Sequence, residues 1–492
     1  AYLSQADIVF YGGAAGGGKG LALNTPLPTP TGWTTMGAVQ IGDELVAPDG
    51  LPCRVIGTSP VQHRRCYRLT FDDGTTLVAD DVHRWVTFNA SELSRLTKAT
   101  PEWRERRRAS RPSAAKGNKS EAFVAAISAR NAARVHACSP TAGTMRDTAE
   151  LAATLRTPSG RANHAIRLTA PLELPHADLP IPPYTLGAWL GDGSSRSGQI
   201  TSADPGILER IKTDGFVVRS YTWSDIAHNI LGLKPLLRAA GVLENKHIPP
   251  VYLRASAEQR LELLQGLMDT DGHAALDGGC EFDTTTERLA DGVLELALSL
   301  GIKATKLDGV ATLRGRDCGP KWRVRFTTSR RVFGLERKAE RLQTATRRTT
   351  EFRYLVACDV VETVPTRCIA VDSASRQFLA GRAMVPTHNT DLLLGLCLTS
   401  QEHSIIFRRE AVQLTGIEER MTKILGTRKG YNSQDGVWRL PGNKVMELGS
   451  VKEPGDWIKY QGRPHDAKLF DEICHFTESQ FRTLIGWLRT DK

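Results

Sequence analysis

The sequence predicts a multidomain protein in which an all-β domain interrupts an α/β domain and is itself interrupted by a mixed α+β domain. At 492 residues the chain exceeds what one hydrophobic core usually supports. Residues 20–90 and 351–389 are short Val/Leu/Ile/Thr runs separated by turns such as PDG and DDG, which is typical of β structure. After residue 390, helical patterns alternate with short apolar runs, as in α/β proteins.

Composition excludes some classes of protein. Hydrophobic residues make up 40% and charged residues 24%, as in ordinary globular proteins, and no run approaches the roughly 18 apolar residues of a membrane helix. The nine cysteines form no C-x-x-C pair, which favours reduced thiols in a cytoplasmic setting over a disulfide framework or a zinc site. The net charge of +10 is compatible with nucleic-acid partners and with many other functions.

The first element is an incomplete nucleotide-binding loop. The apolar run at 8–11 predicts a buried strand, and GGAAGGGK follows it with Gly13, Gly18 and Lys19 at P-loop spacing. The pattern next requires a Ser or Thr hydroxyl for magnesium and then a helix whose amides hold the phosphates. Here Gly20 follows, and LALNTPLPTP after it does not begin a helix.

The missing half of this loop lies far along the chain. Thr390 begins TDLLLGLCLTS, which suits a buried helix, and joining Lys19 to Thr390 completes the P-loop in register. The segment between them, residues 20–389, is 370 residues long. We therefore expect this segment to be an insertion into one nucleotide-binding site.

The inserted segment resembles an intein. GLALNTPLPTPTGWTTMGAVQIGDELVAPDG is similar to the opening block of that family, and GTTLVADDVHRW is similar to its second splicing block, with His83 at the block histidine. RCIAVDSASRQFLAGRAMVPTHN resembles the closing blocks and ends in His388 and Asn389. The resemblance implies an all-β, horseshoe-shaped Hint splicing domain.

The first residue of the insertion departs from the family. Most inteins begin with Cys or Ser, whereas Gly20 has no nucleophile, so either a Cys-to-Gly change has blocked splicing or the chain resembles the third class of inteins. That class lacks the first nucleophile and instead carries a Trp, a Cys and a Thr, which match Trp85, Cys368 and Thr390. These matches favour the third class. Asp80 stands where the second block usually has Thr, which leaves its role at the scissile amide open.

The third-class resemblance implies a specific first step. Cys368, as thiolate, would attack the carbonyl of Lys19 and release the amine of Gly20, since a thiol is the most nucleophilic neutral-pH side chain. His83 would protonate the leaving amine. The hydroxyl of Thr390 would then accept the acyl group as a branched ester.

Cyclisation of Asn389, assisted by His388, would cut the second junction, and the amine of Thr390 would recapture its ester as a peptide. No cofactor is needed for splicing. Each residue also has a plain structural alternative: His83 and Trp85 as packed core residues, and Cys368 as a buried small side chain.

A second pair of motifs lies inside the insertion. TLGAWLGDG and LQGLMDTDG resemble the motif of LAGLIDADG homing endonucleases, and they end in Asp192 and Asp271. Small residues such as Gly187, Ala188 and Gly266 would let two helices approach closely. The two carboxylates could then hold Mg²⁺, which prefers oxygen ligands and can activate water for phosphodiester cleavage.

Other residues of this domain are assigned by the same resemblance. NKHIPPVYL offers Lys246 as a cation that orients phosphate or water, with a solvated surface lysine as the alternative. The strands after each acid would lie in the major groove of double-stranded DNA carrying the uninterrupted gene, with Arg196 and Arg323 as candidate contacts. The basic runs at 103–119 and 330–348 would contact phosphates, the second with helical spacing.

The outer segments indicate the host. KLFDEI at 468–473 reads as a Walker B motif, with Asp471 acting on the magnesium shell and Glu472 activating water. With FYGGAAGGGK, TDLLLG and IIFRRE, it resembles the ATPase of a phage terminase large subunit. That resemblance implies ATP and Mg²⁺ as cofactors after ligation, phage packaging machinery as partner, no membrane, and the cytoplasm of an infected bacterium.

Three functional hypotheses remain: self-splicing with an active endonuclease, splicing with a decayed endonuclease, and a DNA-binding NTPase with an inert insertion. The expected domains are 1–19 (ATPase strand and P-loop), 20–175 (splicing domain, with a basic insertion at about 95–147), 176–345 (endonuclease), 346–389 (splicing domain) and 390–492 (ATPase with Walker B).

Overall fold

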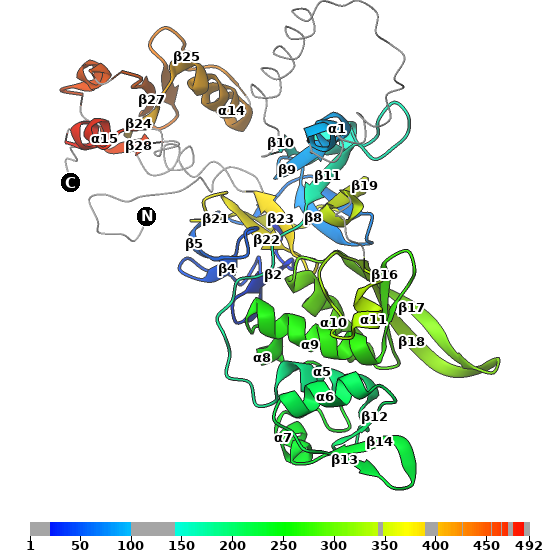
Figure 1. Ribbon diagram of the computed structural model, residues 1–492. Helices are drawn as coiled ribbons and strands as arrows, with labels where there is room; N and C mark the ends of the chain where they lie inside the picture. The colour runs from blue at the N-terminus through cyan, green and yellow to red at the C-terminus, as the bar shows by residue number, and fades with distance from the viewer. Residues whose placement is uncertain are drawn as a thin grey trace, which may run out of the picture.

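The computed structural model describes residues 20–99, 143–342, 348–388, 402–425, 427–453, 455–463, 465–470 and 476–486. In these ranges the chain forms a β domain, a mixed α+β domain inserted into it, and a C-terminal α/β part, each with its own hydrophobic core (Figure 1). No helix in the described ranges has the length and apolar character needed to span a bilayer.

The β domain is built on an eleven-stranded sheet in the order β22-β23-β9-β11-β19-β7-β8-β1-β20-β6, with β10 pairing β9. Alternating burial along β5 and β7 places Val55, Leu69 and Phe71 in one core with Trp85, as expected for strands with one buried face. Its strands are β1 (Leu21–Ala22), β2 (Pro26–Thr29), β3 (Gly32–Thr35), β4 (Glu44–Val46), β5 (Pro52–Thr58), β6 (Gln62–His63), β7 (Cys66–Phe71), β8 (Thr76–Asp80), β9 (Arg84–Asn89), β10 (Thr144–Asp147), β11 (His164–Arg167), β19 (Phe352–Val361), β20 (Pro365–Arg367), β21 (Ile369–Val371), β22 (Gln377–Ala380) and β23 (Val385–His388); its helices are α1 (Ala90–Ala99), α4 (Thr148–Ala153) and α12 (Arg348–Glu351).

The strand order joins the two ends of the predicted insertion. β1 lies between β8 and β20, and β23 pairs with β9, so strands from residues 20–90 and 351–388 are hydrogen-bonded to one another within one sheet. In Figure 1 the blue strands β4 and β5 lie beside the yellow strand β21, which is hydrogen-bonded to β5. The β texture predicted for both segments is therefore present, and they form a single domain.

The mixed domain contains two helices packed along each other and two antiparallel sheets, β12-β14-β13 and β15-β16-β18-β17. The second helix begins at a capping box formed by Ser256 and Gln259. The elements are α5 (Pro183–Asp192), β12 (Gln199–Thr201), α6 (Pro205–Thr213), β13 (Val218–Tyr221), β14 (Ser224–Ile230), α7 (Leu233–Ala239), α8 (Pro250–Leu253), α9 (Ala257–Thr270), β15 (Gly272–Ala274), β16 (Gly279–Thr284), α10 (Glu287–Ser299), β17 (Ala304–Leu313), β18 (Arg316–Thr327) and α11 (Glu336–Ala339).

The basic run at 330–348 is not the continuous helix that its spacing predicts. Within its described part only α11, four residues long, and the start of α12 are helical. The carboxylate of Asp269 accepts the backbone N–H groups of Gly334 and Leu335, which holds the segment before α11 in a non-helical path. The basic run at 103–119 lies outside the described residues.

The C-terminal part contains a five-stranded sheet in the order β25-β26-β27-β24-β28, in which β24 runs parallel to β27 and β28. This parallel centre and the flanking helices agree with the alternation of strands and helices expected after residue 390. The elements are β24 (His403–Arg408), η2 (Ala411–Leu414), α14 (Thr415–Leu425), β25 (Tyr431–Asn432), β26 (Val437–Leu440), β27 (Lys444–Ser450), η3 (Asp456–Tyr460), β28 (Ala467–Phe470) and α15 (Glu478–Ile485).

Buried polar contacts join the β domain to the mixed domain. The carboxylate of Glu295 accepts hydrogen bonds from the indole N–H of Trp33 at 2.9 Å and the guanidinium of Arg254 at 2.8 Å. Arg254 also donates to the carbonyl of Gly32 at 2.7 Å. Because Arg254 and Glu295 belong to the mixed domain and the others to the β domain, these bonds fix the two domains at this contact.

Candidate functional site

Gly20 directly precedes β1, an inner strand of the main sheet of the β domain. Leu21 pairs with Ala79 on one side and with Arg367 on the other. Continuing the antiparallel register by one residue sets Gly20 beside Asp80 and opposite Cys368, where directly opposed Cα atoms are about 4.5–5.5 Å apart. The sheet thus brings the first residue of the insertion next to a carboxyl group and a thiol from two distant segments.

The backbone of Gly20 is packed against β20 without room for a side chain. A Cβ atom at this position would lie 2.6 Å from Cβ and 2.7 Å from Oγ1 of Thr366, and 2.9 Å from the backbone nitrogen of Arg367. Thr366 is fully buried, so it has no free space to move into. Any side chain at residue 20 therefore requires a shift of the strands.

Asp80 holds Gly20 through two hydrogen bonds. The N–H of Gly20 donates to Oδ2 of Asp80 at 2.5 Å, and the N–H of Asp80 donates to the carbonyl of Gly20 at 2.9 Å. Asp80 is fully buried, and this burial raises the pKa of its carboxyl to about 7. The sequence left the role of Asp80 open, and the structure places its carboxylate directly on the nitrogen of the first junction.

His83 lies at the end of the turn that follows Asp80, and its imidazole contacts Thr387, which is near the other end of the insertion. Its Nε2 is 2.5 Å from Oγ1 of Thr387, and its ring meets that of Trp85 edge-on, with centroids 4.7 Å apart. Trp85 is fully buried and donates its indole N–H to Oγ1 of Thr148 at 3.1 Å. Trp85 is thus a core residue that positions the imidazole of His83.

The far end of the insertion returns to the same strand. His388, the last residue of β23, pairs with Arg84, the residue after His83. Both His83 and His388 are buried, with 2% and 6% exposure. The two predicted histidines therefore lie at neighbouring positions of one sheet, although 305 residues separate them in the sequence.

Cys368 occupies the short break between β20 and β21. Its N–H donates to Oγ of Ser59 at 3.0 Å, and its carbonyl accepts the N–H of Ser59 at 2.8 Å. The side chain is 95% buried, and Sγ lies 3.7 Å from the carbonyl oxygen of Ile369. The backbone of the thiol residue is therefore fixed at the position opposite Gly20.

Several predicted residues lie outside the described residues. These are residues of the two junctions and of the nucleotide site: Gly13, Gly18, Lys19, Asn389, Thr390, Asp471 and Glu472. Their roles stay predictions.

The paired helices of the mixed domain approach through their glycines, as the sequence predicts. A Cβ atom on Gly187 of α5 would lie 3.1 Å from Cα of Gly266 on α9, and one on Gly266 would lie 2.7 Å from the backbone nitrogen of Ala188. Such contacts exclude any larger residue and let the two backbones touch. The helices end side by side at Asp192 and Asp271.

The two acids form an interacting pair. Burial raises the pKa of both carboxyls, and the neighbouring charge of Asp192 helps to bring that of Asp271 to about 6. Two adjacent carboxylates repel each other, and a divalent cation with a preference for oxygen ligands removes that repulsion. The donor set therefore fits Mg²⁺, with Asp192 and Asp271 as the residues that would hold it.

Lys246 is half-buried beside this pair. Its Nζ donates to the carbonyl of Gly191 at 2.8 Å and lies 5.3 Å from the ring centroid of Trp189. Burial lowers the pKa of the ammonium, and the charges of Asp271 and Asp192 oppose that shift. Lys246 is thus held at the end of α5 beside the acids, not solvated on the surface.

Sequence reasoning missed a second lysine in the matching position. Nζ of Lys338 on α11 donates to the carbonyls of Met268, Asp269 and Gly272 at 3.0, 2.7 and 2.7 Å. Lys338 thus binds the end of α9 as Lys246 binds the end of α5. In the sequence, Lys338 is marked only by its place in the basic run at 330–348, and that whole run was predicted to contact DNA phosphates.

The two arginines proposed for base contacts are paired within the domain. Arg323 on β18 donates to both oxygens of Asp283 on β16, at 2.7 and 2.8 Å. Arg196, in the loop before β12, is 3.3 Å from the carboxylate of Glu244. Both lie on or next to the strands that follow the acids, as the sequence predicts.

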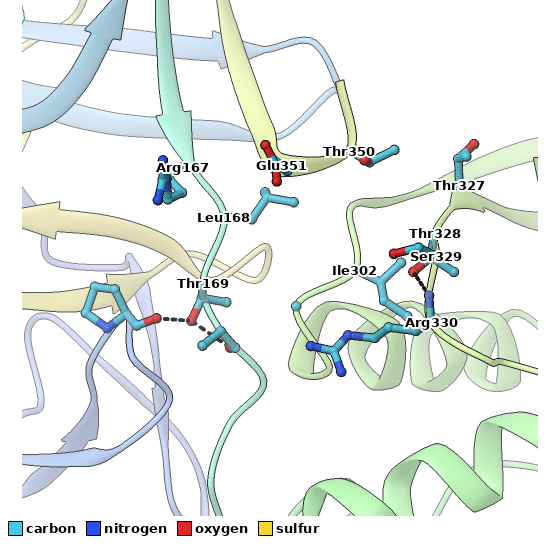
Figure 2. Close-up of a pocket in the computed structure, with 13 residues that line it drawn as sticks. Arg167, Leu168, Thr169, Ile302, Thr327, Thr328, Ser329, Arg330, Thr350 and Glu351 are labelled. Atoms are coloured by element: carbon cyan, nitrogen blue, oxygen red, sulfur yellow. Dashed lines mark hydrogen bonds between the residues drawn. The ribbon is translucent and has the colours of Figure 1, made fainter. Parts of the chain in front are cut away.

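A pocket of about 520 Å³ lies between the β domain and the mixed domain (Figure 2). Thr169, which follows β11, lines it from the β domain, while Ile302 after α10 and Ser329 and Arg330 after β18 line it from the mixed domain. None of the predicted catalytic, metal-binding or nucleotide-binding residues lines this pocket, although Arg330 belongs to the basic run predicted to contact phosphates. The candidate chemistry therefore lies in the sheet and at the helix ends.

Comparison with known proteins gives matches to both parts of the insertion. Residues 258–332 match the model of the LAGLIDADG-like domain. The chain is 39% identical over 452 residues to the replicative DNA helicase DnaB of Mycobacterium intracellulare, covering 88% of this chain and 71% of that protein. It is 50% identical over 86 residues to the DnaB of Mycobacterium leprae (strain TN), covering 17% of this chain and 14% of that protein.

Solved structures similar to this chain include two inteins. The Msm DnaB1 intein splicing domain bound with zinc is 18% identical, with 75% of this chain and 99% of that chain covered and a TM-score of 0.22. The MchDnaB-1 intein is 17% identical over the same shares, with a TM-score of 0.23.

The predicted phage terminase host is wrong, because the matching relatives are replicative DNA helicase DnaB proteins. The predicted partner, phage packaging machinery, and the predicted location, a phage-infected cell, depended on that host and are not supported either. A P-loop and a Walker B motif specify an NTPase and not which one, so those motifs were insufficient to identify the host.

Proposed function

The chain belongs to the family of the replicative DNA helicase DnaB, and we propose that its segment 20–389 is an intein that excises itself and joins Lys19 to Thr390. The observation that carries the proposal is the position of Gly20, held at the start of β1 between Asp80 and the strand that leads to Cys368. The pairing of His388 with Arg84 supports it, since it brings the last residues of the insertion to the same sheet.

The first step uses the thiol opposite Gly20. The thiolate of Cys368 attacks the carbonyl carbon of Lys19, a thioester forms, and the bond to the nitrogen of Gly20 breaks. His83, held by Thr387 and by the ring of Trp85, supplies the proton that the leaving nitrogen requires. This assigns Cys368 as nucleophile and His83 as general acid, and Trp85 acts as a positioning residue.

The later steps use the residues of the second junction. The hydroxyl of Thr390 accepts the acyl group from Cys368, and the side-chain amide of Asn389 cyclises onto its own carbonyl, which cuts the Asn389–Thr390 bond. His388, buried in β23, supports this cyclisation. The amine of Thr390 then attacks the neighbouring ester and forms the peptide bond with Lys19. Every step is an acyl transfer that the chain's own residues carry out.

The packing of Gly20 supports the third-class mechanism over a lost cysteine. We expect Gly20→Cys to slow splicing, because its Cβ would overlap the buried Thr366. Overpacking of this kind costs about 1–3 kcal/mol, or about 5- to 150-fold in rate if the cost falls on the reactive geometry. The measurement is the rate at which the excised segment appears by intact-protein mass spectrometry.

Gly32→Ala is the matched control, because a Cβ atom at that glycine meets nothing within 4 Å. It should splice at the rate of the unchanged chain. Faster splicing of Gly20→Cys would show instead that residue 20 is the site of a missing nucleophile.

We propose that the LAGLIDADG-like domain is a Mg²⁺-dependent homing endonuclease that cuts double-stranded DNA at the uninterrupted host gene. The pairing of Asp192 with Asp271 at the ends of α5 and α9 supports this, as do Lys246 and Lys338 beside them. Bound Mg²⁺ would supply charge to the phosphodiester and a more acidic water. Lys246 and Lys338 bind the ends of α5 and α9. The hydroxyl groups of the Thr/Ser-rich strands after the acids can donate hydrogen bonds to DNA.

Ligation would restore the host's nucleotide site. We propose that Gly13, Gly18, Lys19 and Thr390 then bind the phosphates and magnesium of ATP, with Asp471 and Glu472 as the Walker B pair. The parallel strands β24, β27 and β28 support an α/β ATPase fold. The unspliced chain should not hydrolyse ATP, since Lys19 and Thr390 lie on opposite sides of the insertion.

Incubation of the purified chain tests the proposal as a whole. Intact-protein mass spectrometry should show a 370-residue fragment and a ligated product of the two outer segments. A chain that stays whole would support the alternative of an inert insertion. If splicing occurs but Mg²⁺ does not support cleavage of the uninterrupted gene, the endonuclease has decayed.

A further inference from the structure

We propose that Asp80 is a positioning residue for the first splicing step: it orients the Gly20 amide for attack and then binds the Gly20 amine that the step releases. This inference rests on the proposed splicing function. The inference goes beyond that function because it assigns a role to Asp80, the residue at which the chain departs from the second splicing block.

The geometry fixes the nitrogen that must leave. The 2.5 Å bond from the Gly20 N–H to Oδ2 of Asp80 and the 2.9 Å bond from the Asp80 N–H to the Gly20 carbonyl hold Gly20 at two points. The pairing of β1 with β20 holds it from the other side. The amide nitrogen therefore faces the carboxylate of Asp80, while Cys368 follows the strand on the other side of Gly20.

The second carboxylate oxygen has an unused capacity that the product can fill. Oδ1 of Asp80 is buried and has no hydrogen-bond partner among the described residues. An amide nitrogen offers one N–H, whereas a free amine offers two and an ammonium three. The released Gly20 nitrogen can therefore donate to both oxygens. Because a buried acceptor without a partner is costly, Asp80 favours the released state over the intact amide.

The charged and titratable groups around Asp80 have contacts of their own, and Asp80 supplies the carboxylate that contacts the Gly20 nitrogen. The side chain of Arg64, which attracts it, is itself 3.2 Å from the carboxylate of Asp81. Cys66 pairs with Asp80 across β7 and β8, and burial raises the pKa of its thiol, so it is neutral. His83 follows in the turn and donates its backbone N–H to the backbone carbonyl of Asp80 at 3.3 Å. Burial brings the pKa of Asp80 to about 7, so its charge changes within the working pH range.

The step balances with these groups. The Cys368 Sγ–carbonyl bond forms and the bond between the Lys19 carbonyl and the Gly20 nitrogen breaks. The proton that the thiol loses makes good the one that His83 gives to the nitrogen, so the nitrogen becomes a neutral amine and the number of protons is unchanged. One further proton from water converts the amine into an ammonium that pairs with the Asp80 carboxylate. The carboxylate acts in its ionised form, so this contribution should increase as the pH rises through about 7.

The test isolates the first step in the full chain carrying Asn389→Ala and Thr390→Ala, which stops the reaction at the thioester. Dithiothreitol then cleaves the thioester and releases residues 1–19. Mass spectrometry measures the rate of this release from about pH 5.5 to about pH 8.5, in steps of ~0.5 pH units. In this background Asp80→Asn should slow release about 10-fold or more at the upper pH values. It should also remove the rise in rate near pH 7 that titration of Asp80 contributes. Asp80→Thr retains an acceptor without charge, and it should lose the same rise while folding normally.

Asp81→Asn is the matched control, because that acid is adjacent but faces Arg64. It should keep the rate at the upper pH values and still show the rise, but the rise should move to lower pH, because the charge of Asp81 helps to raise the pKa of Asp80. An Asp80→Asn chain with the unchanged rate and profile would overturn the proposal, as would an equal effect of Asp81→Asn. A failure of the proposed splicing function can be told apart from a failure of this inference. If the splicing proposal is wrong, a chain with Cys368→Ala in the same background should still release residues 1–19.

Discussion

Replacing Cys368 with alanine should abolish every splicing product, leaving neither the 370-residue fragment nor the ligated outer segments detectable after prolonged incubation. The reason is that the strand register sets the thiol of Cys368 opposite Gly20, and Gly20 has no side chain of its own. Loss of the nucleophile removes a covalent step that neighbouring groups do not replace. Gel electrophoresis and intact-protein mass spectrometry would measure the result.

Cys358→Ala is the matched control in the same domain. Burial and the charge of Asp359 raise the pKa of the Cys358 thiol to about 12, so it stays protonated and unreactive. This variant should splice normally. Splicing by Cys368→Ala, or loss of splicing in both variants, would contradict the role assigned to Cys368.

Replacing either Asp192 or Asp271 with asparagine should reduce Mg²⁺-dependent cleavage of the uninterrupted DNA site by about 100-fold or more. Each substitution removes one of the two charges that would hold the cation. Because the pKa values of both carboxyls are raised, protons compete with the cation, and cleavage by the unchanged chain should fall as the pH drops through about 6. Supercoiled plasmid carrying the site gives the cleavage rate.

Glu209→Gln, on the exposed face of α6, is the control and should cleave normally. DNA binding in the absence of metal and the splicing rate should both survive in the aspartate variants, since the acids lie at the ends of α5 and α9 and not in the β domain. Undiminished cleavage by both aspartate variants would contradict the assignment of these acids.

The parts of this fold that could be predicted are those that depend on local pattern. The alternation of apolar residues around Leu69 and Phe71 marks strands, and the glycines of TLGAWLGDG and LQGLMDTDG mark helices that touch. Each of these signals is contained within a few neighbouring residues, so the sequence displays it directly.

The rest depends on contacts between distant residues. Asp80 could not be assigned, because its partner Gly20 is 60 residues away and meets it only through the order of the strands. Lys338 was hidden in a basic run whose helical spacing is overridden by the carboxylate of Asp269. The wrong host has a different cause: nucleotide-binding motifs report the chemistry of phosphate binding, which unrelated motors share.

The most direct measurement of the central claim is the identity of the residue that carries Lys19 after the first junction opens. In a chain with Asn389→Ala and Thr390→Ala, peptide mass spectrometry at mildly acidic pH, which preserves thioesters, should find residues 1–19 attached to the sulfur of Cys368 and a free amine on Gly20. Residues 1–19 attached to any other side chain, or a junction that stays intact while Asp80 and His83 are unchanged, would contradict the account.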